Sequence, residues 1–273
     1  MSLGSAAIWI AAMVGAGAVG GILAGLLGVG GGIVIVPLLY HLLGLMDVAS
    51  DISMHIAVGT SLAIIVPTAF ISARSHAKRG SVDGALLRSW GPAIFIGVLL
   101  GTVLAGGFDS EVLVAIFATV ALLVAANMLF RREGAKVADG FPGRGTKMGL
   151  GIFVGGFSAL MGIGGGTLSV PILSAFGFPV RIAVGTSAAI GMIIAVPGAL
   201  GYFLWGLNVS GKPPLTVGFV NLIAVAAIIP MTTLLAPVGV RIAHAIPQRA
   251  LRYCFALFLG LTSIRMFFDV FVK

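Results

Sequence analysis

Gly28-Val29-Gly30-Gly31-Gly32 runs through four apolar residues into Pro37, and Gly162-Ile163-Gly164-Gly165-Gly166 runs through four residues into Pro171. Each glycine cluster is followed by a second shared phrase, Val-Gly-Thr-Ser, at residues 58–61 and 184–187. Both clusters lie in apolar surroundings, where a water-soluble loop is not expected. The chain therefore contains an internal duplication, and the doubled glycine cluster is the feature around which its fold is predicted.

The composition indicates a polytopic membrane protein whose solvent is the lipid bilayer. Hydrophobic residues make up 59% of the chain, charged residues make up 9%, and the mean hydropathy is +1.17. Its apolar runs are long enough to cross a membrane. The net charge of +8 does not indicate a nucleic-acid partner, because the basic residues lie in short gaps between apolar runs.

The spacing predicts an all-α fold of two repeats with about five helical segments each. Full membrane spans are predicted at residues 55–73, 91–107, 111–130, 183–204, 215–238 and 250–271. Shorter or broken apolar pieces flank the glycine clusters, at 6–27, 33–46, 148–161 and 167–178. The chain is accordingly divided into a first transmembrane repeat (1–130), a cytoplasmic linker (131–147) and a second transmembrane repeat (148–273).

The pieces around the second glycine cluster are too short to span a bilayer. They contain 14 and 12 residues, whereas a crossing needs about 20 residues. We therefore expect both clusters to be the apices of broken-helix hairpins that meet near the bilayer midplane. Residues 15–20 also match the dinucleotide fingerprint G-x-G-x-x-G, but without the strand, amphipathic helix and acid it requires. Their small side chains indicate close packing of transmembrane helices instead.

The basic residues predict the orientation. If each full span switches sides, 13 of the 16 lysines and arginines fall on one side, which is then cytoplasmic. Both termini are then outside, and the two repeats have opposite topology. This inverted-repeat plan is typical of secondary transporters.

The apices are the predicted anion site. A helix that begins after three glycines directs unpaired backbone N–H groups and its positive dipole end into the protein. The alternatives are helix packing through small residues and, for the hydroxyls, hydrogen bonds to their own helices. We expect valine at Gly31 or Gly165 to enter a polar cavity and leave the fold intact. The predicted substrate-binding residues are Gly30, Gly31, Gly32, Thr60, Ser61, Gly164, Gly165, Gly166, Thr186 and Ser187.

Other chemistry finds no support in the sequence. Every Asp and Glu lies at the end of a span or in a loop, so a carboxylate-based sodium or proton relay is not expected. His41 and His55 flank the predicted external turn, where an interfacial role is expected. No metal site, cofactor site, nucleophile or acid–base constellation is found, so an enzyme is not predicted.

The paired G-x-G-G-G-x-x-x-x-P stretches, each followed by Val-Gly-Thr-Ser, resemble the sulfite exporter TauE/SafE family of membrane permeases. The resemblance covers residues 10–270. It implies transport of a small sulfur-containing anion, such as sulfite or a sulfonate, across a bacterial inner membrane. The second repeat departs from the first in having Ala188 where the first has Leu62.

Two other function classes are weighed against a secondary transporter that works by alternating access, with export as the expected direction. An anion channel would share the glycine apices but would need a continuous polar pore. A membrane enzyme or assembly factor would need a reactive constellation. Within transport, a permease for another small carboxylate or inorganic anion stays open, as do the coupling ion and the oligomeric state.

Overall fold

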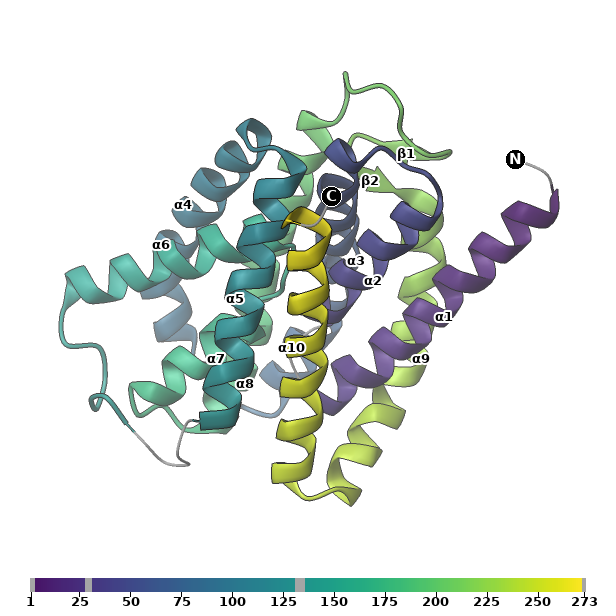
Figure 1. Cartoon of the computed structure of the whole chain (residues 1–273). Helices are drawn as coiled ribbons and strands as arrows, with labels where there is room; N and C mark the ends of the chain where they lie inside the picture. Colours follow the sequence, from purple (N-terminus) through teal and green to yellow (C-terminus); the bar gives the residue numbers. More distant parts are fainter. Residues whose placement is uncertain (1–2, 28–30, 131–135, 272–273) are drawn as a thin grey trace.

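The computed structural model describes residues 3–27, 31–130 and 136–271. Within these ranges the chain forms ten α-helices and one two-stranded antiparallel hairpin (Figure 1). The first half contains α1 (Leu3–Leu27), α2 (Gly32–Leu45), α3 (Ser50–Lys78), α4 (Gly84–Gly107) and α5 (Ser110–Phe130). The second half contains α6 (Arg144–Met161), α7 (Gly166–Ala175), α8 (Val180–Trp205), β1 (Thr216–Val217), β2 (Val220–Asn221), α9 (Leu222–Ala245) and α10 (Gln248–Phe271).

Six of these helices have the length and apolar composition of membrane spans, namely α3, α4, α5, α8, α9 and α10. They correspond to the six full spans that the sequence predicts. Helices α2 and α7 are shorter apolar helices of 14 and 10 residues. The prediction of an all-α polytopic membrane protein is therefore confirmed.

The start of α9 differs from the prediction. The sequence places a span from residue 215, whereas α9 begins at Leu222. Leu215 and Gly218 have φ angles of 55° and 60°, which a regular helix excludes, and residues 216–221 form the β1–β2 hairpin. Asn221 then caps α9, because its side-chain oxygen accepts the N–H of Ala224 at 2.8 Å.

The glycine clusters interrupt the helices, as predicted. Gly31, with φ 78°, precedes α2, and Gly162, with φ 64°, ends α6. Left-handed backbone of this kind favours glycine. Gly31 and Gly162 do not occupy the same place in the duplicated motif. The residue that matches Gly31 is Gly165, and its φ is −58°. The same sequence pattern therefore produces two different local backbones.

Most of the larger helix contacts come in matched pairs. Helix α1 packs on α9 as α6 packs on α4, and α2 packs on α3 as α7 packs on α8. Helix α8 contacts α4 as α3 contacts α9, while α3 packs on α8 and α5 packs on α10. Exchanging the first five helices for the last five therefore leaves this set of contacts unchanged.

Glycines bring the paired helices close together. Gly17 and Gly21 on α1 face the backbone of α9, and Gly151 and Gly155 on α6 face α4. A Cβ added at Gly21 would lie 2.7 Å from the Cα of Thr232. The packing interpretation of the glycine-rich stretch in α1 is thus confirmed at Gly17.

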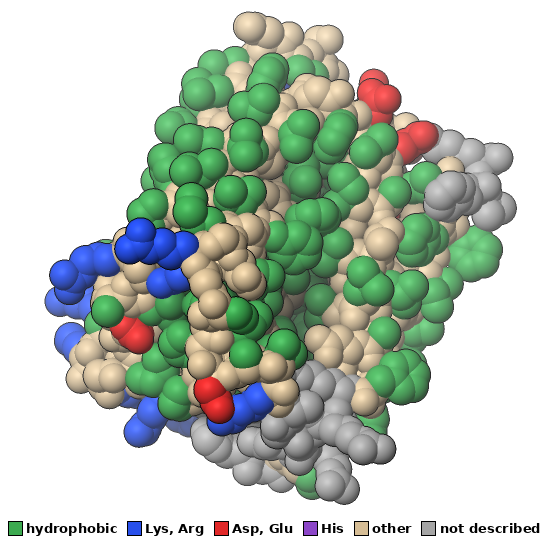
Figure 2. Space-filling view, turned by 90° about the vertical axis from the view of Figure 1, so that its left-hand side faces the viewer, with side chains coloured by type: hydrophobic (Ala, Val, Ile, Leu, Met, Phe, Trp, Pro, Cys, Tyr) green, Lys and Arg blue, Asp and Glu red, His purple; other side chains and the backbone are tan. Residues whose placement is uncertain are grey.

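The molecule has two distinct ends (Figure 1). The β1–β2 hairpin and the end of α10 lie at the top of this view, which we call the hairpin end. The end of α5 and the α9–α10 loop lie at the bottom, which we call the basic end. Figure 2 shows lysine and arginine side chains gathered on the lower part of one face, below a predominantly hydrophobic region. This separation places an apolar belt between the two ends.

Candidate functional site

The two glycine clusters lie against each other in the centre of the fold. A Cβ added at Gly32 would lie 2.7 Å from the carbonyl oxygen of Gly162 and 2.9 Å from the Cα of Ile163. Ser61 Oγ donates a hydrogen bond of 2.7 Å to the same Gly162 oxygen. Gly30, a predicted site residue, lies outside the described residues. Among those described, backbone from both halves therefore meets directly, without side chains between.

A small cavity of about 60 Å³ lies beside the second glycine cluster. It is enclosed by α3, the start of α7 and the first part of α8. Since about 10–15 Å³ of such space admits one water, the cavity is large enough for a small ion. It brings together four of the predicted site residues, Gly164, Gly165, Gly166 and Ser187. The rest of its lining consists of Ile65, Thr68, Ala69, Ser72, Ala188 and Gly191.

Ser187 gives this cavity a hydrogen-bond donor. The residue is fully buried, at 0% exposure, and its Oγ has no hydrogen-bond partner among the described residues. A buried hydroxyl without a partner costs about 1–3 kcal/mol. By contrast, Thr68 Oγ1 is satisfied, because it lies 3.1 Å from the Ile64 and Ile65 oxygens of its own helix. Ser187 therefore lines the cavity and has a hydroxyl that no described residue satisfies.

The start of α7 supplies further donors. Gly165 precedes the helix and provides no side-chain cap, and Gly166 is its first residue. The first N–H groups of a helix have no intrahelical acceptor and carry its positive dipole end. Because both glycines line the cavity, uncapped backbone and the Ser187 hydroxyl border the same space. This combination suits an anion.

The two motif threonines make a different, matched contact. Thr186 Oγ1 accepts the backbone N–H of Asp83 at 2.9 Å, and Thr60 Oγ1 accepts the backbone N–H of Asn221 at 2.9 Å. Asp83 and Asn221 are the N-cap residues of α4 and α9. Each threonine therefore holds the start of a helix from the other half. Neither threonine, nor Ser61, lines the 60 Å³ cavity.

Two expectations about individual residues are wrong. A Cβ at Gly165 would lie 2.5 Å from the backbone oxygen of Ser187, so valine cannot enter there without moving backbone. At Gly31, the positive φ strains any L side chain. His55, expected near the membrane interface, is buried within the protein at 6% exposure, and its Nε2 lies 3.1 Å from the oxygen of Ala105.

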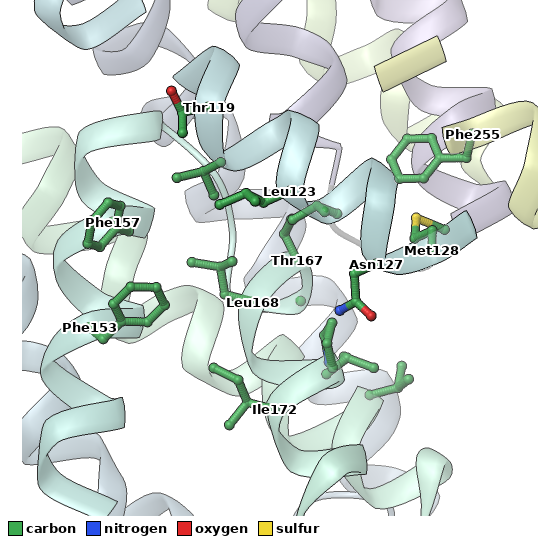
Figure 3. Close-up of a pocket in the computed structure, with 16 residues that line it drawn as sticks. Thr119, Leu123, Asn127, Met128, Phe153, Phe157, Thr167, Leu168, Ile172 and Phe255 are labelled. Carbon is green, nitrogen blue, oxygen red and sulfur yellow. The ribbon is translucent and has the colours of Figure 1, made fainter. Parts of the chain in front are cut away.

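A larger cavity of about 610 Å³ lies between α5, α6 and α7 (Figure 3). Its lining is mostly apolar, including Phe153, Phe157 and Leu168, and among its polar members Thr167 has a buried, unpartnered Oγ1. Gly166 lines both cavities, so the start of α7 stands between them. An unpaired charge is costly in apolar surroundings, and the smaller cavity is therefore the better candidate for an anion.

Sequence reasoning did not find Ser72 and Gly191. Ser72 lies on the face of α3 that also presents Ile65 and Thr68 to the cavity. That helical spacing of three and four residues was the available signal. Gly191 likewise follows Ser187 by four residues on α8.

The fold and this cavity define a helical membrane protein of the transporter type, with a small polar site where a helix is broken. Residues 13–266 match the family model described as Sulfite exporter TauE/SafE. The chain belongs to this family of membrane transporters, which confirms the resemblance seen in the duplicated motifs.

Relatives cover most of the chain. A probable membrane transporter protein of Haemophilus influenzae is 34% identical over 251 residues, 92% of this chain and 95% of the relative. A probable membrane transporter protein of Methanocaldococcus jannaschii is 27% identical over 254 residues, 90% of this chain and 91% of the relative. No solved structure matches the chain.

Proposed function

We propose that this protein is a secondary transporter that exports a small sulfur-containing anion across the bacterial inner membrane by alternating access. The anion is sulfite, a sulfonate or a similar organic anion. It occupies the 60 Å³ cavity and accepts hydrogen bonds from the N–H groups at Gly165 and Gly166 and from Ser187 Oγ. The observation that carries the proposal is Ser187, which lines the cavity together with the start of α7 and whose buried hydroxyl has no partner among the described residues.

The character of the donors fits reversible binding of an anion. Among the described residues, the cavity lining contains no Asp or Glu that would repel negative charge and no Lys or Arg that would hold it permanently. Backbone N–H groups and a hydroxyl satisfy an anion without a fixed opposite charge. The other predicted residues with hydroxyl side chains, Thr60, Ser61 and Thr186, support the site by holding helix ends and apices together.

The two halves are proposed to be inverted repeats, which would give the cavity a counterpart on the other side. The matched helix contacts support this arrangement. So do the two threonine contacts: their donors, Asp83 and Asn221, are 138 residues apart (221 − 83), and the threonines 126 (186 − 60). The basic end is proposed to be cytoplasmic and both termini to be outside, by the positive-inside rule.

Transport by the purified full-length protein in proteoliposomes tests the proposal. Radiolabelled sulfite, sulfoacetate, sulfate and a small carboxylate such as acetate are offered under an outward or inward gradient, with empty liposomes as the control. We expect saturable flux of sulfite or sulfoacetate that is inhibited by the unlabelled compound. Flux that rises linearly with concentration would establish a channel instead. Saturable flux of carboxylates alone, with no sulfur anion carried, would overturn the substrate assignment.

A further inference from the structure

The duplicated sequence defines a position in the other half that corresponds to the 60 Å³ cavity, and that position is filled by a side chain. With the offset of 126 that relates the two Val-Gly-Thr-Ser phrases, Ala188 corresponds to Leu62 (188 − 126) and Ser72 corresponds to Gly198 (72 + 126). Ala188 and Ser72 both line the 60 Å³ cavity. The counterpart lies on the hairpin side of the glycine clusters, since α3 and α8 run in opposite senses between the two ends (Figure 1).

Leu62 occupies the counterpart position. Its side chain is 0% exposed and lies against Gly198, where an added Cβ would be 3.0 Å from Leu62 Cδ1. Leu62 on α3 thus fills the space that Ala188 leaves open on α8.

The hydrogen bonds differ in the same direction. Ser61 corresponds to Ser187 (187 − 126), yet Ser61 Oγ is bonded to the Gly162 oxygen whereas Ser187 Oγ is unpartnered. On the hairpin side the serine hydroxyl is satisfied by protein and the space is closed. On the basic side the hydroxyl is free and the space is open.

We infer that Leu62 is the gate on the hairpin side of the anion site. Release toward the hairpin end then requires the Leu62 side chain to leave Gly198, and Ala188 on the basic side offers no comparable barrier. The inference rests on the proposed transport function, because a gate has meaning for a site that is reached from both ends. By this inference, the difference between Leu62 in the first repeat and Ala188 in the second controls access to the anion site from the two ends.

Thiol labelling in nanodiscs tests the gate, because both ends are open to reagent there and no substrate is needed. Cys254, the native cysteine, is first replaced by serine. Single cysteines are then placed at Ser72 and at Gly198, the matched positions, with and without Leu62→Ala. The rate of modification by a charged methanethiosulfonate is measured for each full-length variant.

We expect the cysteine at Ser72 to react in both backgrounds and the cysteine at Gly198 to react when Leu62 is alanine. Since a minor open state is typically about 0.1–10% populated, permanent opening raises the labelling rate by about tenfold or more. The reciprocal change, Ala188→Leu, should slow labelling at Ser72 by a similar factor. Size exclusion and melting temperature show whether Leu62→Ala is folded. If that variant unfolds, the Ala188→Leu variant still tests the gate.

Unchanged labelling at Gly198 in a folded Leu62→Ala protein would overturn the gate. So would a cysteine at Ser72 that remains equally reactive beside Ala188→Leu. These results are independent of the flux measurements. If the labelling results contradict the gate but sulfite transport is saturable, the proposed function still holds. If the labelling results match the expectation but no anion is transported, the proposed function is refuted and the closure by Leu62 is not.

Discussion

Replacing Ser187 with alanine should make the protein more stable and the transporter weaker. The hydroxyl has no partner in the described structure, so its removal should relieve about 1–3 kcal/mol of burial cost in the absence of substrate. The bound anion, however, loses a hydrogen bond to a charged group, which contributes about 1.5–3 kcal/mol. The dissociation constant should therefore rise by about 10- to 150-fold.

Two serines provide matched controls. Ser169 is also fully buried with an unpartnered Oγ but does not line the 60 Å³ cavity, so Ser169→Ala should stabilise without changing affinity. Ser61→Ala should destabilise by about 1–3 kcal/mol, because it leaves the buried Gly162 oxygen without its side-chain donor. Melting temperature in detergent and anion affinity by calorimetry are measured for all three. An unchanged affinity in Ser187→Ala would refute the site.

Further changes test the framework. Thr186→Val should lower the unfolding free energy by about 1–3 kcal/mol, because the N–H of Asp83 loses its acceptor; reduced affinity with unchanged melting would instead make the threonine a ligand. Gly155→Ala should prevent folding, since its Cβ would overlap α4 backbone, whereas Gly149→Ala on the same helix meets nothing within 4 Å and should be tolerated, as size exclusion will show. A cysteine at Gly140 in a Cys254-free protein should resist an impermeant reagent added to intact cells, and labelling from outside would reverse the proposed orientation. Transport should proceed in sodium-free proteoliposomes, because the described lining of the cavity holds no carboxylate to bind the ion, and a strict requirement for sodium would contradict the proposed site.

Much of the fold could be predicted because membrane helices reveal themselves by length and hydropathy. The six full spans follow from the lengths of the apolar runs, and the two breaks follow from the glycine clusters that interrupt such runs. The β1–β2 hairpin was missed, although Gly218 and Asn221 are turn and cap residues, because the flanking residues are as apolar as a span. Hydropathy alone does not distinguish an apolar hairpin from the beginning of a helix.

The candidate site was predictable in its residues but not in its grouping. The duplicated motif identified Ser61 and Ser187 together, and only their surroundings separate them, since one is bonded to Gly162 and the other is unpartnered. Likewise, the motif did not predict the hydrogen-bond partners of Thr60 and Thr186. Their partners are N-cap residues 161 and 103 positions away, and contacts of that separation leave no trace in local sequence.

These long-range threonine contacts have a consequence for how the protein is made. The N–H of Asn221 that Thr60 accepts is synthesised 161 residues later, after helices α6, α7 and α8. Closing such a loop is slow and entropically costly. Until it closes, α3 of the first half lies in the membrane without its contacts to the second half. Helices α3 and α8 each complete the other half's fold. The halves are therefore expected to mature together, and a chain released after the linker should be a target for quality-control proteolysis rather than a stable half-transporter.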